Sequence, residues 1–415
     1  MTGGNIITGT GTLTLGGNVT GNADANSATI SGNLNLGGAT RTFTIADGGA
    51  SDDMAISAVI SNGGMTKAGA GTLTFSGSNT YTGVTTISAG TLSINTLQNV
   101  SGGSSSLGAP TTATNGTIAL GATGILQYTG TGHSSNRVIN LTGDGGSVDA
   151  SGSGAFTLSA GVTGNTFNLV LTGTGTGVES GVIATTNGTL TKSSTGTWTL
   201  SGLNTYTGKT TISNGTLSIN TLQNVSGGSS SLGAPTTVAN GTIALGATGI
   251  LQYTGTGHSS NRVINLTGDG GSVDASGSGA FTLSAGVTGN TFNLVLTGTG
   301  TGVESGVIAT TNGTLTKSGS GTWTLSGANT FTGGVTVNQG TIKIGNVNAL
   351  GATNTAVTAV IVNSGGAVDF NGVSAEYGYT IAGTGVGGTG ALVNTGANIG
   401  NGAAQTSNIE LSDNA

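Results

Sequence analysis

The sequence predicts an all-β fold, and within that class a β-solenoid in which short strands stack coil upon coil. Three observations predict it: the composition, the alternation of apolar and polar residues, and a long internal repeat. Of the 415 residues 83 are Gly, only 5% are charged, two are Pro and none is Cys. Helices need Ala, Leu, Glu, Lys and Arg in quantity, whereas Thr, Val, Ile, Asn and Gly suit strands joined by tight turns.

The apolar residues are placed as an ordered sheet requires. They make up 34% of the chain and recur in short alternating runs, for example Thr-Leu-Thr-Leu at 12–15 and Thr-Trp-Thr-Leu at 197–200. Such alternation buries one face of a strand and leaves the other in water. The pattern therefore favours packed strands over the flexible Gly/Ser/Thr-rich segment that the composition could also indicate.

Charge and residue types exclude several classes of partner and cofactor. Eight Lys plus Arg and a formal net charge of −6 cannot neutralise a phosphate backbone, so nucleic acid is excluded. No apolar run reaches the roughly 18 residues of a membrane helix. Because Cys is absent, disulfides and thiolate metal sites are excluded as well. We expect no cofactor and no metal ion.

A near-identical repeat organises the chain. Residues 92–193 recur as residues 217–318, 125 positions later, with two differences: Ala113 against Val238 and Thr114 against Ala239. We therefore predict one continuous solenoid built from 125-residue units. Its predicted segments are a diverged partial unit at 1–91, repeat units at 92–216 and 217–341, and a diverged partial unit at 342–415.

Within one unit, strand-like pieces come every eight to twelve residues and no helical piece separates them. Asn-Gly marks several junctions, at 115–116, 187–188 and 214–215. Asn-Gly between strands also favours antiparallel hairpins, so a β-sandwich is the alternative. The lack of polar linkers and the low charge favour the solenoid, with coils of roughly 20 residues.

One sub-segment occurs three times at the 125-residue spacing. It reads GTLTFSGSNTYTG at 71–83, GTWTLSGLNTYTG at 196–208 and GTWTLSGANTFTG at 321–333, and a Lys stands four residues before each copy. We predict that the Lys, the Leu or Trp and the aromatic residue of each copy are structural motif residues. They are Lys67, Leu73 and Tyr81; Lys192, Trp198 and Tyr206; and Lys317, Trp323 and Phe331.

The pattern from Lys67 to Leu92, with its copies at 192–217 and 317–342, resembles the autotransporter-associated β-strand repeat, also called the passenger-associated transport repeat. Ser-Ser-Leu-Gly at 105–108 and 230–233 and Asn-Ala-Leu-Gly at 348–351 resemble the segment that often follows it. The resemblance implies a right-handed parallel β-helix. It also implies that this β-helix is a passenger, which a C-terminal membrane barrel carries to the bacterial surface. Residues 342–415 lack the alternation of about ten residues per barrel strand, so we expect no membrane span within this chain.

Several residues could suggest chemistry, but each has a simpler interpretation. His133, Arg137, Asp144 and Asp149 lie close in sequence, yet all recur as His258, Arg262, Asp269 and Asp274. Because an enzyme normally has one cleft, we interpret them as residues of polar turns and predict no catalytic site. Two carboxylates, here or at Asp52 and Asp53, are few for Ca²⁺, which takes six to eight oxygens.

Two further patterns suggest ligands. Gly-Thr-Gly-Thr-Gly at 173–177 has no following helix to bind a phosphate. Trp198 and Trp323 correspond to Leu73 in the first copy, which favours a core position over a sugar-binding one. Thr-x-Thr pairs such as Thr197 and Thr199 would bind ice only if they recurred on consecutive coils, and they lapse for long stretches.

The sequence thus predicts a non-enzymatic structural protein at the bacterial cell surface or outside the cell. Our leading hypothesis is a stalk or passenger segment that acts in surface display, adhesion or cell–cell contact. The alternative is a self-assembling extracellular fibre whose subunits stack head to tail. A β-helical glycan-active enzyme and an ice-binding solenoid are further alternatives. The expected partners are other copies of the chain, surface glycans or neighbouring cells.

Overall fold

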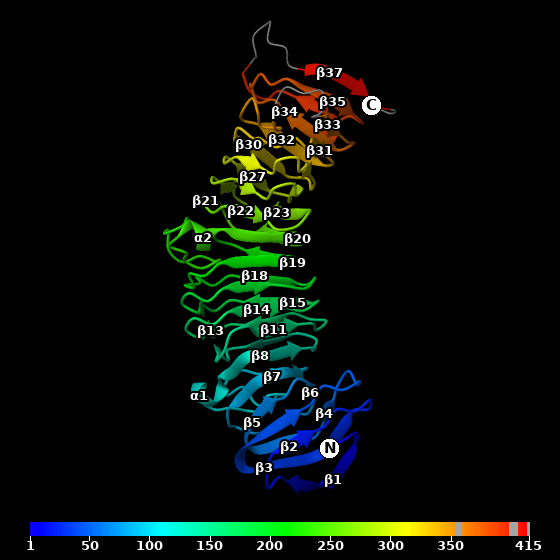
Figure 1. Ribbon diagram of the computed structural model, residues 1–415, viewed down its shortest axis with the longest axis vertical. Helices are drawn as coiled ribbons and strands as arrows, with labels where there is room; N and C mark the ends of the chain where they lie inside the picture. The colour runs from blue at the N-terminus through cyan, green and yellow to red at the C-terminus, as the bar shows by residue number, and fades with distance from the viewer. Residues whose placement is uncertain (353–358, 398–405, 413–415) are drawn as a thin grey trace. The chain divides into compact units, whose positions relative to one another are not determined.

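The structure is a computed structural model that describes residues 1–352, 359–397 and 406–412. The chain forms two compact units, Met1–Gly208 and Lys209–Ala415, called here the first and second units. The strand pairs within each unit are parallel, as between β8 (Ile118–Tyr128) and β10 (Ile139–Leu141). Figure 1 shows these strands stacked one on the next within each unit. The prediction of an all-β parallel solenoid is confirmed, and the β-sandwich of hairpins is wrong.

The first unit is made of strands, the longest of 18 residues, with one helical turn. Its remaining elements are β1 (Gly4–Thr14), β2 (Val19–Gly21), β3 (Ala28–Ile45), β4 (Met54–Ile56), β5 (Val59–Ala68), β6 (Thr72–Phe75), β7 (Thr85–Ile94), α1 (Ala113–Gly116), β9 (His133–Ser135), β11 (Gly146–Ala150), β12 (Phe156–Leu158), β13 (Val162–Thr163), β14 (Leu169–Thr172), β15 (Thr176–Glu179), β16 (Ile183–Ala184), β17 (Leu190–Lys192) and β18 (Thr197–Leu200).

The second unit has the same character. Its elements are β19 (Thr210–Ile219), α2 (Val238–Gly241), β20 (Ile243–Tyr253), β21 (His258–Ser260), β22 (Ile264–Leu266), β23 (Gly271–Ala275), β24 (Phe281–Leu283), β25 (Val287–Thr288), β26 (Leu294–Thr297), β27 (Thr301–Glu304), β28 (Ile308–Ala309), β29 (Leu315–Lys317), β30 (Thr322–Leu325), β31 (Val335–Val337), β32 (Gly340–Ile344), β33 (Ala359–Val362), β34 (Gly366–Asp369), β35 (Tyr377–Ile381), the 3₁₀ turn η1 (Val386–Gly388), β36 (Leu392–Val393) and β37 (Thr406–Leu411).

Successive coils stack their strands in columns, and three columns can be followed in each unit. In the second unit the first column contains parts of β19 and β20, then β22, β25 and β28. The second contains the remaining parts of β19 and β20, then β23, β26, β29, β31, β33, β35 and β37. The third contains β21, β24, β27, β30, β32, β34 and β36. The first unit has the corresponding columns β10–β13–β16, β11–β14–β17 and β9–β12–β15–β18. Inward side chains are buried and alternate with half-buried outward ones, as in β14 and β18. This alternation is the period of two that a strand imposes.

The Asn-Gly junction at 214–215 has a different role from the one that a hairpin would give it. Asn214 and Gly215 lie inside β19, where the register against β20 shifts, and Gly215 has a φ of 67°. Glycine adopts this left-handed conformation without the cost that a side chain would add. The strand therefore bends from one column into the next, and its direction around the coil is kept.

The 125-residue repeat does not match a whole number of coils. In the second column, Leu217, Leu251, Val273, Leu296, Lys317 and Val337 are successive partners, 34, 22, 23, 21 and 20 residues apart. The residue equivalent to Leu217 in the next copy, Ile342, instead lies in the third column beside Trp323. The repeat thus covers five coils and then advances by one column. The expected length of roughly 20 residues per coil holds only for the shorter coils.

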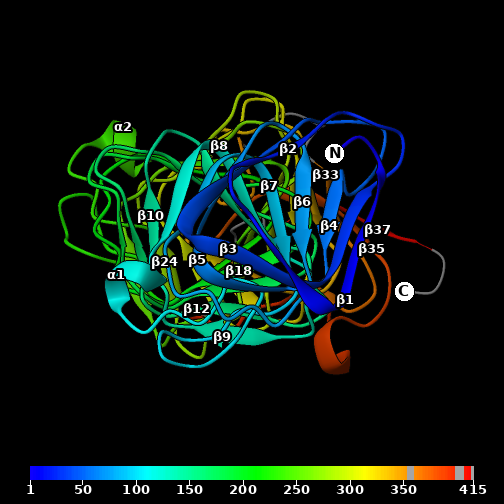
Figure 2. The ribbon, with the colours of Figure 1, turned by 90° about the horizontal axis from the view of Figure 1, so that it is seen from below.

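A loop at residues 95–117 explains the longest coil of the first unit. It contains α1, a single turn whose N-terminus is capped by the side chain of Thr112. The sequence pattern predicts no helix here, because a four-residue turn leaves no apolar period to detect. The loop is tied to the next coil: Val100 N–H donates to Asn136 Oδ1, and Asn136 N–H donates to Asn99 Oδ1, both at 2.8 Å. In both views α1 lies outside the stacked strands of its unit (Figures 1 and 2).

Candidate functional site

The predicted motif residues lie in the interior of the coils. Each of them is at most 1% exposed: Lys67, Leu73, Tyr81, Lys192, Trp198, Tyr206, Lys317, Trp323 and Phe331. Their side chains come from a strand, the following strand and the loop after it, so each motif copy occupies more than one coil. The motif is therefore a set of contacts between coils.

The motif lysine donates hydrogen bonds to backbone carbonyls of its own turn and of the next coil. Lys317 Nζ donates to the carbonyl oxygens of Ser318 at 2.7 Å, Gly319 at 2.6 Å and Gln339 at 3.0 Å. The first two belong to its own turn, and the third belongs to the next coil. Gly340 leaves room for the ammonium, since a Cβ there would lie 2.8 Å from Nζ. Burial lowers the pKa of Lys317 to about 8.

The other two lysines make the same kind of contact. Lys67 Nζ donates to Ala68 O, Gly69 O and Ala89 O at 2.8–3.0 Å, and Lys192 Nζ donates to the carbonyls of two residues in its own turn. Burial lowers the pKa of each to about 8, and for Lys67 the charge of Asp53 acts in the opposite direction.

The Leu or Trp position is a core slot whose size is set by the coil beneath it. Trp198 lies on Gly177 and Trp323 lies on Gly302, and a Cβ on either glycine would lie 2.3–2.4 Å from the indole. Each indole N–H also donates to a backbone carbonyl at 2.8 Å. In the first copy Leu73 lies on Met54 instead. In the second and third copies tryptophan thus packs on glycine, and in the first copy leucine packs on methionine.

The motif asparagine is a contact residue that the sequence analysis did not single out. Asn329 Oδ1 accepts the backbone N–H of Ile308 at 2.8 Å, and its Nδ2 donates to Ala349 O at 2.6 Å. Asn79 makes the equivalent bonds, to Ile60 N–H and Ser106 O. The sequence does contain a signal for it, because an asparagine stands two residues before the aromatic residue in all three copies. The asparagine joins the coil before it to the loop after it.

The aromatic residue receives that loop. Gly108 packs on Tyr81, where a Cβ would lie 2.2 Å from the tyrosine carbonyl and about 3.0 Å from its ring, and Gly351 packs in the same way on Phe331. Tyr81 Oη lies 2.9 Å from Thr85 Oγ1, and burial raises its pKa to about 12. The Ser-Ser-Leu-Gly and Asn-Ala-Leu-Gly segments are therefore the parts of the chain that dock on the motif.

Replacing Asn329 by Asp is expected to destabilise the second unit by about 2–4 kcal/mol. The new carboxylate would face Ala349 O, which has lost its donor, and would be buried with one backbone N–H. A urea melt followed by circular dichroism measures the change. The control is Asn312→Asp in an exposed turn, which we expect to leave the midpoint unchanged. Equal midpoints for the two variants would contradict the bridging role.

The residues that suggested catalysis are not brought together. His133 Nδ1 lies 2.8 Å from Tyr128 Oη, and the buried Arg137 donates from Nε to Gly116 O and from Nη1 to Leu107 O. Asp144 accepts the backbone N–H of Asn168, in the turn before β14. Arg137 thus anchors the 95–117 loop. Among the described residues no three His, Asp or Glu side chains gather as a metal site would require.

The remaining candidates also lie in structural positions. Asp149 accepts from Ser151 Oγ, and Asp53 accepts the backbone N–H groups of Gly48 and Thr72. Thr197 and Thr199 of β18 stack on Thr176 and Val178 of β15. This threonine pair therefore continues onto the preceding coil at one of its two positions, whereas an ice-binding ladder would require both.

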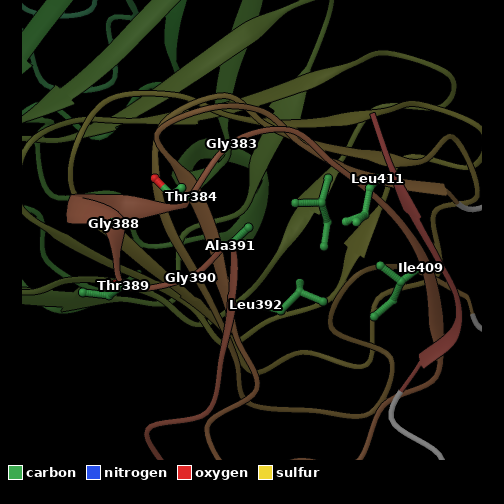
Figure 3. A pocket seen from close by; sticks show the side chains of 10 residues that line it. Gly383, Thr384, Gly388, Thr389, Gly390, Ala391, Leu392, Ile409 and Leu411 are labelled. Carbon is green, nitrogen blue, oxygen red and sulfur yellow. The ribbon is translucent and has the colours of Figure 1, made fainter. Parts of the chain in front are cut away.

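A hollow of about 580 Å³ lies near β35, β36 and β37 in the second unit. Figure 3 shows the side chains of Leu392, Ile409 and Leu411 around it. Its other lining residues are mostly Gly, Thr and Ala, with no charged side chain. None of its lining residues carries a titratable side chain.

Comparisons with known proteins agree with this geometry. The family model of the passenger-associated-transport-repeat matches residues 65–94, 190–219 and 315–344. Each match contains one motif lysine, asparagine and aromatic residue. No solved structure matches significantly. Of the described helices, none has the length and apolar character needed to cross a membrane.

The chain is also similar to a curated protein, the adhesin BmaC autotransporter of Brucella suis biovar 1 (strain 1330). The two are 36% identical over 381 residues, which is 86% of this chain and 11% of that protein's length. The resemblance that the sequence analysis identified is confirmed. The chain carries three passenger-associated transport repeats of the autotransporter type and, over most of its length, is similar to a stretch of an autotransporter adhesin.

Proposed function

We propose that the chain is a structural, non-enzymatic solenoid segment of a bacterial surface passenger, acting in surface display, adhesion or cell–cell contact. The buried motif carries the proposal. Its lysine, asparagine and aromatic side chains bond one coil to the next, so the residues that most resemble a functional signature are used for cohesion. The similarity to an adhesin points to the same role.

The charge distribution supports a mechanical role. Of the eight Lys and Arg residues, five are fully buried: Lys67, Arg137, Lys192, Arg262 and Lys317. Few cations remain at the surface to hold an anionic substrate. We further propose that the coils are right-handed, as the family resemblance implies, and that such a solenoid lengthens in steps of 125 residues. Added length would place the outer part of the protein farther from the cell.

Replacing residues 92–341 of the surface-displayed protein by a Gly/Ser linker of equal length tests this function. We expect cells that carry the linker version to attach less to host cells and to one another, because a flexible chain does not hold its end away from the cell. Antibody staining of an epitope at the outer end controls for the amount displayed. Equal attachment at equal display would refute a structural role in adhesion.

A second candidate is the fibre, in which copies of the chain stack head to tail. The near-identity of residues 92–193 and 217–318 favours it. Coils of the same sequence present matching faces to one another, so that copies could stack as the coils of one chain do. Electron microscopy at high concentration distinguishes the two functions: long filaments support the fibre, and single short particles rule it out.

A further inference from the structure

Two glutamates are buried in the interior of the third column, and neither the motif nor the proposed function uses them. Glu304 lies in β27 in register between Leu283 and Leu325, and Glu179 lies in β15 between Leu158 and Leu200. They are 0% and 1% exposed. A carboxyl group therefore stands where the neighbouring coils have leucine.

The hydrogen bonds of these carboxyl groups suit a neutral acid. Glu304 Oε1 accepts the backbone N–H of Gly306 at 3.0 Å, and Glu179 Oε1 accepts that of Gly181 at 2.8 Å. In each case Oε2 has no hydrogen-bond partner among the described residues. A buried carboxylate needs several donors or a cation, whereas a protonated group has much less to satisfy.

The neighbouring strands supply no compensating charge. The strands paired with β27 are β24 and β30, and those paired with β15 are β12 and β18; none of the four carries a titratable side chain. Of the strands near β15, β11 carries Asp149, which accepts from Ser151. The nearest motif lysine in sequence to Glu304, Lys317, bonds three backbone carbonyls.

We propose that Glu179 and Glu304 are neutral carboxylic acids in the folded protein and form a pH-sensitive device. Their coils are closed at acidic pH and open locally more often as the pH rises. Ionisation would place an unpaired charge among leucines. The affected coil would then open locally, and the coils stacked on either side would remain folded, because each coil of a solenoid contacts mainly its neighbours.

The direction of the pH effect follows from linkage. Burial raises the pKa of both glutamates from 4.5 to about 8. Their contribution to stability is therefore complete below pH 4.5 and is lost as the pH rises to about 8. The motif lysines act in a separate window. Since their pKa is lowered from 10.5 to about 8, their effect is a rise in stability between those two values.

Hydrogen exchange of the full chain, read by mass spectrometry at about pH 5 and about pH 8 and corrected for the intrinsic pH dependence, tests the device. In the wild type we expect the corrected opening constant of peptides covering 281–308 to rise by roughly tenfold or more. In Glu304→Gln it should stay constant, while the peptides covering 156–183, around the unchanged Glu179, should still respond. Glu376→Gln, at an exposed position, should behave as the wild type.

A wild type whose corrected exchange is the same at both pH values would overturn the proposal. So would a Glu304→Gln variant that keeps the full response. If Glu304→Gln does not fold, Glu304→Leu replaces it, because leucine already occupies the neighbouring positions at 283 and 325. These results are independent of adhesion, so they and the test of the proposed function can fail separately.

Discussion

Replacing Gly302 by Met is expected to destabilise the second unit by more than about 3 kcal/mol, because the new side chain has no space. A Cβ at Gly302 would lie 2.3 Å from the ring atoms of Trp323, which is itself fully buried. The φ of Gly302 is not in the left-handed region, so the effect is steric and not a backbone strain. Urea melts followed by circular dichroism measure it.

The second change that tests this packing is Trp323→Leu combined with Gly302→Met. The pair would then match Met54 and Leu73, which occupy the equivalent slot of the first motif copy. Trp323→Leu alone should cost about 2–4 kcal/mol by leaving a cavity. We expect the double variant to lose less stability than the sum of the losses in the two single variants, by roughly 2 kcal/mol.

The control for an added side chain is Gly378→Ala in β35, where a Cβ would meet no atom within 4 Å. We expect no loss of stability there. Additive effects of Gly302→Met and Trp323→Leu would contradict a shared slot, and so would a Gly302→Met variant as stable as Gly378→Ala.

Replacing Lys317 by Met is expected to cost about 3 kcal/mol. Methionine fills a similar volume, but the carbonyls of Ser318, Gly319 and Gln339 lose their donor. The variant should also lose part of the rise in stability between about pH 8 and 10.5, because that rise comes from the lowered pKa of the lysine. Urea midpoints recorded across this range measure both effects.

Lys343→Met is the matched control, since it removes the same charge from a more exposed site. The side chain of Lys343 is 33% exposed, and its Nζ lies 3.6 Å from Asp369. The Asp369 carboxylate also accepts hydrogen bonds from Asn371 and Thr395, so we expect the loss of this long ion pair to cost at most about 1 kcal/mol. If Lys317→Met cost no more than Lys343→Met, the ammonium would not be a bond between coils.

Much of the fold follows from local patterns. Alternation in runs such as Thr-Trp-Thr-Leu predicts which side chains point inward, and Trp198 and Leu200 are indeed buried. The dipeptide Asn214-Gly215 is ambiguous by itself, because the same dipeptide can close a hairpin or bend a strand from one column into the next. Its role depends on the partner strand, β20, which begins 24 residues after β19 ends. No local signal carries that information.

Part of the candidate site likewise follows from the sequence, and part of it does not. The repetition of Lys, Leu or Trp and an aromatic residue identified the motif, yet the asparagine between them was not singled out. Polar residues in a Thr- and Asn-rich chain look alike until burial distinguishes them. Asn329 is 2% exposed, and that burial makes its two hydrogen bonds matter.

By itself the sequence determined that the chain is all-β, that it repeats every 125 residues and which faces of its strands are apolar. Those properties depend on neighbours along the chain. Only the tertiary structure decided that the repeat spans five coils plus one column, and that Trp323 stands over Gly302. The physical reason is register: which residues stack depends on the summed lengths of intervening turns and loops, and alternation with a period of two leaves that sum open.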